Sequence, residues 1–239
     1  MNKAKHIEKI SGRKLKKTVF HILSQNNCDH AVNEIIRFPL KQVVNPLFSF
    51  FYSSEEIIRW HAITAMGAVV GRLADHDTES ARVVMRRLIW NLNDESGGIG
   101  WGSPEALGEI MACSRCMAEE YHFLLLSYIN PEGNYIEYEM LQRGVLWGLG
   151  RLAYARPQLV RQAPSLLIPY MQSQDATLRG LAVWIAGAFE ISEELRPLLA
   201  SLTADSTAIE LYLNRQFIKI SISRLAALAI TKIQNSKPY

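Results

Sequence analysis

The chain has 239 residues, of which 49% are hydrophobic and 21% are charged, a balance that is ordinary for a soluble globular protein. No uninterrupted apolar run approaches the roughly 18–20 residues that a membrane-spanning helix needs. No apolar signal-peptide segment follows the basic N-terminus, and the three cysteines are too few for a disulfide framework. We therefore expect a cytoplasmic protein without a membrane segment.

The net charge of +3 is unevenly distributed along the chain. Residues 1–20 carry seven basic side chains and one acidic side chain, which gives this segment a charge of +6 and leaves −3 on the rest. A slightly acidic body argues against a nucleic-acid partner. The basic start is interpreted as a solvated helix face, and contact with an acidic partner or with nucleic acid is the alternative.

Three helices are predicted before residue 55, over residues 13–27, 30–37 and 40–53. Phe38-Pro39 separates the second helix from the third, whose apolar surface is wide. This region matches the later repeat pattern poorly. We expect it to form an N-terminal cap over residues 1–54, because a terminal repeat has to present one polar face.

From residue 55 the sequence predicts a succession of helix pairs, over 55–73 and 78–92, 104–117 and 118–129, 135–154 and 158–172, and 176–190 and 193–203. A small residue begins the apolar stripe in the first helix of each pair, and these residues recur 44, 38 and 36 residues apart: Ala62, Ala106, Gly144 and Gly180. Periods of this size indicate stacked helical units, and small residues let neighbouring helices pack closely. Residues 55–203 are therefore predicted to form the repeats.

Residues 204–239 are expected to form a C-terminal cap, with one or two helices over 206–234. Almost nothing in the chain alternates with period two, so no sheet is expected. Ser192 is predicted to be the N-cap of the last repeat helix.

Two pieces of sequence resemble the HEAT-repeat family, in particular the short bacterial HEAT repeats that also occur in phycobilisome-lyase-like proteins. They are Arg143-Gly144…Gly148…Gly150 with the following Leu166-Leu167…Tyr170-Met171, and Arg179-Gly180-Leu181-Ala182…Ala186-Gly187 with the following Leu198-Leu199. The segment over residues 93–106 also looks like one found in an uncharacterised group of HEAT proteins from anaerobic bacteria. The resemblance implies one all-α, right-handed solenoid of antiparallel helix pairs over residues 1–239, used as a non-catalytic scaffold that binds a protein partner.

The loop over residues 93–105 is the best candidate for a site, because helices of a repeat are usually joined by only a few residues. Glycines permit positive φ and let the backbone approach a ligand closely, and this loop has four: Gly97, Gly98, Gly100 and Gly102. Ser103 is predicted to be the N-cap of the next helix and Pro104 its first residue. Nearby acids disfavour a phosphate and favour a cation, a positively charged side chain of a partner or a neutral ligand: Asp94, Glu95, Glu105 and Glu109. The alternative is a structural loop whose Trp101 packs over the groove.

Cys113 and Cys116 have CxxC spacing, but a metal site needs about four ligands and the chain has no second such pair. They are interpreted as small buried residues on one helix, and neither a metal nor a cofactor is expected. The tryptophans that occur once per repeat are interpreted as core residues or as an aromatic lining of the groove: Trp60, Trp101, Trp147 and Trp184.

The candidate binding surface combines the glycine-rich loop with neighbouring groove residues: Asp94, Glu95, Gly98, Gly100, Trp101, Ser103, Glu105, Trp60, His61, Arg143 and Trp147. The alternative function is that of a HEAT-like DNA glycosylase acting on alkylated purines, whose aromatic, acidic and arginine residues would be Trp101, Glu105, Arg143 and Trp184. That family uses Asp where this chain has Glu105, and the acidic body lacks the basic surface that DNA requires. The identity of the partner and the oligomeric state are left open.

Overall fold

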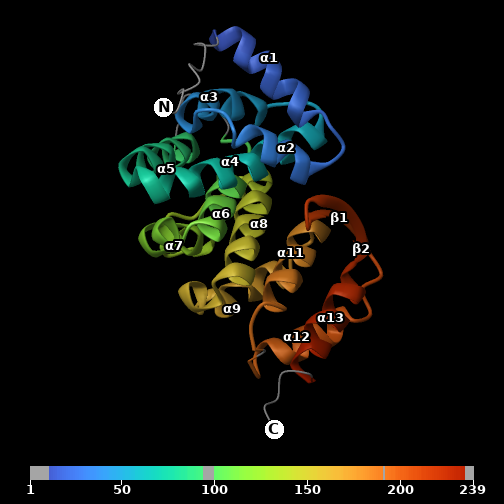
Figure 1. The fold of residues 1–239 in the computed structure, drawn as a ribbon. Helices are drawn as coiled ribbons and strands as arrows, with labels where there is room; N and C mark the ends of the chain where they lie inside the picture. The colour runs from blue at the N-terminus through green and yellow to red at the C-terminus, as the bar shows by residue number, and fades with distance from the viewer. Residues whose placement is uncertain (1–10, 94–99, 191, 235–239) are drawn as a thin grey trace.

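The computed structural model describes residues 11–93, 100–190 and 192–234 as a curved stack of helices (Figure 1). The N-terminal helices are α1 (Gly12–Leu23), α2 (Cys28–Ile35) and α3 (Leu40–Phe50). The stack continues with α4 (Glu56–His76), α5 (Thr78–Asn93), α6 (Ser103–Cys113), α7 (Arg115–Ile129), α8 (Glu139–Ala155), the 3₁₀ helix η1 (Pro157–Val160), α9 (Ala163–Leu166) and α10 (Ile168–Met171). It ends with α11 (Ala176–Ala186), α12 (Leu195–Leu202), β1 (Ala208–Leu213), β2 (Gln216–Ser221) and α13 (Ile222–Gln234).

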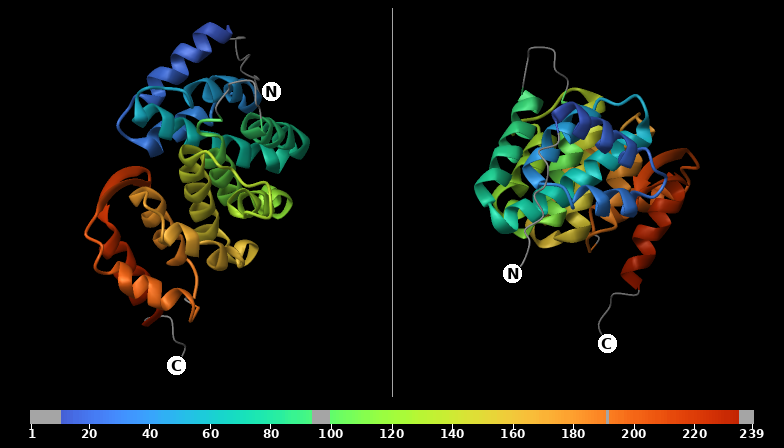
Figure 2. Two further views of the ribbon diagram at one scale, coloured as in Figure 1. Left: turned by 180° about the vertical axis from the view of Figure 1, so that it is seen from behind. Right: turned by 45° about the horizontal axis from the view of Figure 1, so that its top comes forward.

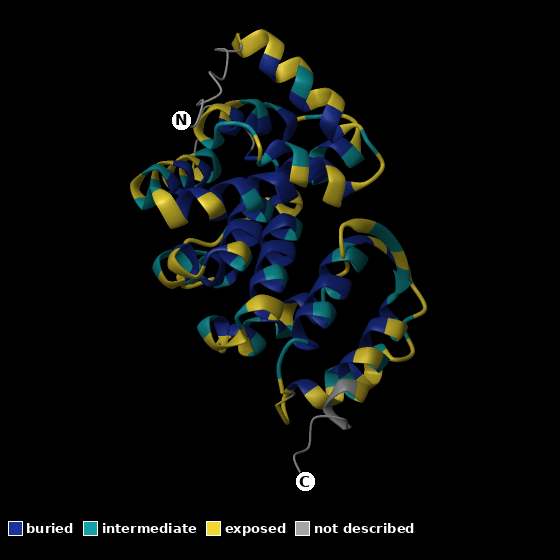
Figure 3. Ribbon diagram, in the orientation of Figure 1, coloured by how far each residue is buried: buried dark blue, intermediate teal, exposed yellow. Residues whose placement is uncertain are grey.

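The helices α4, α6, α8 and α11 pack against one another in chain order and form the inner layer of an α-solenoid, which confirms the predicted fold class. More than half of the residues in each of these helices are buried, whereas α1 and α5 expose one polar side to solvent (Figure 3). None of the helices within the described residues is both long enough and apolar enough to cross a membrane.

Small residues bring the inner helices together, as the sequence predicts. A Cβ atom on Gly108 of α6 would lie 2.2 Å from the Cα of Gly148 on α8, and one on Gly148 would lie 2.5 Å from the carbonyl oxygen of Pro104. Because real Cβ atoms do not approach backbone this closely, only glycine permits this helix spacing.

Several predicted helix boundaries are wrong. The helix predicted over 158–172 is broken into η1, α9 and α10, because Pro164 and Pro169 lack the N–H that a continuous helix would use. The break predicted at 117/118 lies at Ser114, whose hydroxyl oxygen accepts a hydrogen bond from the N–H of Met117 at 3.4 Å. Ser192 is not the N-cap of α12, which begins three residues later at Leu195.

The expectation of no sheet is also wrong, because residues 208–221 form an antiparallel β-hairpin where a closing helix was predicted. Leu213 pairs with Gln216, so the turn consists of two residues, Asn214 and Arg215, with positive φ values of 51° and 65°. Two consecutive residues with positive φ are what a tight turn between twisted strands requires. The helix α13 follows directly and confirms a helical end for the chain as far as residue 234.

The hairpin folds back over the inner layer, and with α13 it lies on the side of the stack opposite to α5 and α7 (Figures 1 and 2). Its turn reaches the N-terminal helices, where Arg215 forms an ion pair with Asp29 of α2. Trp147 of α8 donates a hydrogen bond from Nε1 to the carbonyl oxygen of Tyr212, at 2.7 Å. The C-terminal hairpin therefore covers part of the groove formed by the repeats.

Candidate functional site

A cavity of about 250 Å³ lies between the inner helices and the hairpin. We call it the aromatic cavity, and its walls include Trp60 of α4, Trp101 and Glu105 at the start of α6, Arg143 and Trp147 of α8, and Tyr212 of β1. Five of the candidate residues thus come together from three repeats, although they lie up to 87 positions apart in the chain.

Three further candidate residues, His61, Gly100 and Ser103, do not line the aromatic cavity. His61 is fully buried and its Nδ1 lies 2.9 Å from the carbonyl oxygen of Leu23, at the end of α1. Burial lowers the pKa of His61, so its imidazole is held in the neutral form. Gly100 packs against the end of α5, where an added Cβ would lie 2.8 Å from the carbonyl oxygen of Asn91. Asp94, Glu95 and Gly98 lie outside the described residues.

The predicted N-cap at Ser103 is displaced by one residue. Gly102 precedes α6 with a φ of +72°, and Ser103 is the first helical residue and is fully buried. A side chain at Gly102 would be strained by its backbone conformation, and its Cβ would also lie 2.9 Å from the Phe51 ring. This tight turn presents Trp101 beside Tyr138, with the two rings edge to face and their centroids 6.4 Å apart.

The back wall of the aromatic cavity is a cluster of rings. The Trp60 ring is stacked on that of Tyr212 with centroids 4.7 Å apart, and its centroid lies 4.6 Å from that of Trp147. Phe217 of β2 extends the cluster, with its ring 5.3 Å from that of Tyr212. Sequence reasoning missed Tyr212 and Phe217, because both lie in the segment that was predicted to be helical.

Arginine–aspartate pairs connect the later repeats. Arg143 of α8 donates a hydrogen bond from Nε to Asp175, the N-cap residue of α11, at 2.9 Å. Arg179 of α11 likewise bonds through Nε to Asp205, which follows α12, at 3.1 Å. Each arginine comes directly before the small residue of its repeat, and each pairs with an aspartate that follows the last helix of the same repeat.

Glu105 occupies the same position in the repeat of α6, directly before Ala106. The next N-cap residue is Tyr138, not an aspartate, and it makes no side-chain capping bond. Glu105 Oε2 is shielded from solvent and has no hydrogen-bond partner among the described residues. Burial raises the pKa of Glu105 to about 7, although its own backbone N–H and the charge of Arg59 oppose the shift.

Gly144 leaves the space that this carboxylate occupies. A Cβ atom there would lie 2.7 Å from Glu105 Oε1 and 2.8 Å from Oε2. The two arginines of the cavity are both engaged elsewhere, since Arg59 bonds to Glu56 at 2.7 Å and Arg143 bonds to Asp175. The aromatic cavity therefore combines aromatic rings with one carboxyl group whose buried Oε2 has no hydrogen-bond partner among the described residues.

The arrangement predicted for a glycosylase is only partly present. Trp101, Glu105 and Arg143 share the aromatic cavity, but Trp184 lies in a separate groove, stacked on Tyr154 with ring centroids 5.4 Å apart. No lysine is among the described residues that line the aromatic cavity. A DNA-binding surface would instead need unpaired basic side chains along the groove.

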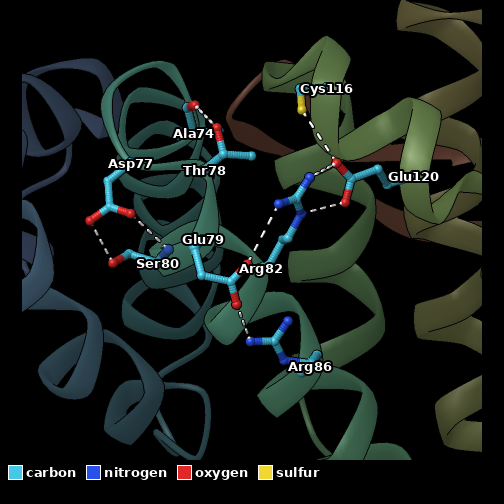
Figure 4. A network of polar contacts seen from close by, with 9 residues as sticks. All are labelled: Ala74, Asp77, Thr78, Glu79, Ser80, Arg82, Arg86, Cys116 and Glu120. Carbon is cyan, nitrogen blue, oxygen red and sulfur yellow. Dashed lines mark hydrogen bonds and ion pairs between the residues drawn. The ribbon is translucent and has the colours of Figure 1, made fainter.

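The interpretation of the cysteine pair as buried residues on one helix is wrong. Cys113 ends α6, Cys116 lies in α7, and both are exposed. Cys116 contacts Glu120 at 3.6 Å, and Glu120 accepts two hydrogen bonds from Arg82, at 2.8 Å and 2.6 Å (Figure 4). Partial desolvation and the adjacent Glu120 carboxylate raise the pKa of the exposed Cys116 thiol, which disfavours the thiolate that metals bind.

We therefore expect the double variant Cys113→Ser, Cys116→Ser to fold normally. Its free energy of unfolding should lie within about 0.5 kcal/mol of the wild-type value. No group of three or more potential metal ligands occurs among the described residues. Elemental analysis of the purified wild-type protein should find no stoichiometric zinc or iron. One equivalent of metal that disappears in the double variant would contradict this expectation.

No family model matches the chain. An uncharacterised protein of Archaeoglobus fulgidus is 23% identical over 184 residues, which cover 75% of this chain and 91% of that protein. A designed armadillo repeat protein in complex with the peptide (KR)4 has a similar fold, with a TM-score of 0.53 and 14% identity over 92% of this chain and 99% of the design. An engineered protein is similar to the same degree, with a TM-score of 0.53, 10% identity and coverage of 92% and 96%. These likenesses establish an armadillo-like helical-repeat solenoid.

Proposed function

We propose that this protein is a non-catalytic binding scaffold and that its aromatic cavity receives a segment of a protein partner. The observation that carries the proposal is the convergence of Trp60, Trp101, Trp147 and Tyr212 on one recess of the concave surface. Helical-repeat proteins use such concave surfaces to bind extended partners. Aromatic side chains in a partly desolvated recess supply most of the affinity in many protein interfaces.

Two further observations support binding of a peptide-like partner. The designed armadillo protein with a similar fold is in complex with a peptide, (KR)4. The described lining of the aromatic cavity also offers apolar contact surface for such a segment, from Met140, Leu181 and Leu211. We also propose that the repeats are of the HEAT type. We further propose that the protein is cytoplasmic, which agrees with its three free cysteines.

A library of random peptides displayed on phage tests the proposal. Peptides enriched on the wild-type protein should bind about thirtyfold more weakly to Trp101→Ala, because loss of an anchoring aromatic costs about 2 kcal/mol in affinity. The matched control is Trp90→Ala, since Trp90 is 64% exposed on α5, away from the aromatic cavity. Isothermal titration calorimetry should give Trp90→Ala the affinity of the wild type.

Two results would count against the proposal. Equal loss of affinity in the Trp101 and Trp90 variants would place binding elsewhere. Loss of about 3–5 kcal/mol of stability in Trp101→Ala, with normal peptide binding by the folded fraction, would identify Trp101 as a core residue.

A further inference from the structure

We infer that the aromatic cavity takes the cationic side chain of a lysine or arginine in the partner segment, and that the carboxylate which meets this side chain is Glu105. The inference rests on the proposed function, which it makes more specific. It identifies the chemical class of the bound residue and assigns a role to an acid that departs from the repeat pattern.

The departure lies in the arginine–aspartate pairs. Arg143 and Arg179 each precede the small residue of a repeat, and each bonds to an aspartate that follows the last helix of the same repeat. In the repeat of α6 the arginine is replaced by Glu105 and the aspartate by Tyr138. The repeat of α6 therefore lacks the arginine cation at this position and has the Glu105 carboxyl group instead. That position faces the aromatic cavity.

The packing around Glu105 keeps its carboxyl group inside the aromatic cavity. Gly144 leaves room for both carboxylate oxygens, and Oε2 is buried with no hydrogen-bond partner among the described residues. A buried carboxyl group without partners is costly in its charged form, so its pKa is raised to about 7. A bound cation supplies the missing partner and favours the carboxylate.

The charges around the cavity favour a cation over an anion. Arg59 and Arg143 are already bonded to Glu56 and Asp175. The remaining charged lining residues are both acidic, namely Glu105 and the exposed Glu210 of β1. An acidic side chain would therefore meet uncompensated negative charge, whereas a basic one would be attracted.

The rings and the size of the cavity fit a single long basic side chain. The partly exposed rings of Trp60 and Trp101 can hold a cation or the apolar stem of lysine or arginine, through cation–π attraction and burial. The volume of about 250 Å³ is below the ~300–1,000 Å³ of pockets that enclose a whole drug-sized ligand.

Synthetic versions of an enriched peptide test this inference by a double-mutant cycle. The anchoring lysine is replaced by norleucine, which keeps the stem and removes the charge, and Glu105 is replaced by Gln. Each single change should weaken binding at least about tenfold, because a hydrogen bond between charged groups is lost. The two changes together should weaken binding no more than either alone. The matched control is Glu132→Gln, at an exposed glutamate that does not line the aromatic cavity, and this variant should bind as the wild type does.

The outcomes separate the inference from the proposed function. Two outcomes would overturn the cation assignment but not the proposed binding function. In the first, the peptides that depend on Trp101 have no anchoring cation. In the second, they bind Glu105→Gln with unchanged affinity. The absence of any peptide that depends on Trp101 would overturn both. If Glu105→Gln fails to fold, the lysine and norleucine peptides can still be compared on the wild-type protein. Equal affinity of the two peptides would contradict the inference.

Discussion

Glu105→Gln should be more stable than the wild-type protein above neutral pH, by about 3 kcal/mol at pH 8. Burial raises the pKa of Glu105 from 4.5 to about 7 in the folded protein. The folded state therefore holds this proton more tightly than the unfolded chain does. The resulting stabilisation is fully present below pH 4.5 and is lost as the pH rises through 7. Glutamine is neutral throughout, so the variant does not lose it.

Urea unfolding at about pH 5 and about pH 8 measures this difference. Glu56, Arg59, Arg143 and Glu210 share the cavity with Glu105 and are present in both proteins, so the comparison isolates the change at residue 105. Glu210→Gln is the control. Because Glu210 is exposed, the free energy of unfolding of this variant should match that of the wild type at both pH values. A constant difference between Glu105→Gln and the wild type would show that Glu105 is an ordinary solvated carboxylate.

Gly108→Ala should lower the free energy of unfolding by about 2–3 kcal/mol, although alanine is a better helix former than glycine. The added Cβ would lie 2.2 Å from the Cα of Gly148, so α6 and α8 would have to separate. Their contact also positions Glu105 beside Gly144. For a chain of this length, thermal unfolding should show a fall in Tm of roughly 5–10 °C.

Gly12→Ala provides the matched control, because nothing lies within 4 Å of a Cβ added at this position in α1. It should be neutral or stabilising by up to about 1 kcal/mol. If Gly108→Ala behaves like Gly12→Ala, the close approach of α6 and α8 is not required by the fold.

The sequence was sufficient to predict the solenoid and part of the aromatic cavity. Recurring small residues predict close helix packing, and Gly108 and Gly148 show how that packing is achieved. Because corresponding positions of successive repeats lie side by side, residues near each small residue share one surface. This regularity is the reason that the sequence predicts a shared surface for Trp60, Glu105 and Arg143, which line the same cavity.

The sequence did not predict the hairpin that completes the cavity. Each strand has only six residues, and the Asn214-Arg215 turn lacks the glycine that usually marks a tight hairpin. The hydrogen bond from Trp147 to Tyr212 joins residues 65 positions apart, so no local sequence pattern predicts it.

The acids near the loop could not be sorted from sequence either. Glu109 bonds to Arg151 at 2.6 Å, 42 positions away, whereas Glu105 has no such partner among the described residues. Only the fold distinguishes a neutralised acid from one that can receive a cation.

The most direct test of a cation-binding aromatic cavity is ¹⁹F NMR of protein labelled with 5-fluorotryptophan. The five tryptophans provide their own controls, because Trp60, Trp101 and Trp147 line the aromatic cavity whereas Trp90 and Trp184 do not. Single Trp→Phe variants assign the five signals. An enriched lysine peptide should shift the signals of Trp60, Trp101 and Trp147 and leave the other two in place, and the norleucine peptide should shift them only at much higher concentration. Saturation with the lysine peptide that moves only Trp90 or Trp184, or none of the five, would contradict the assignment of the aromatic cavity as the binding site.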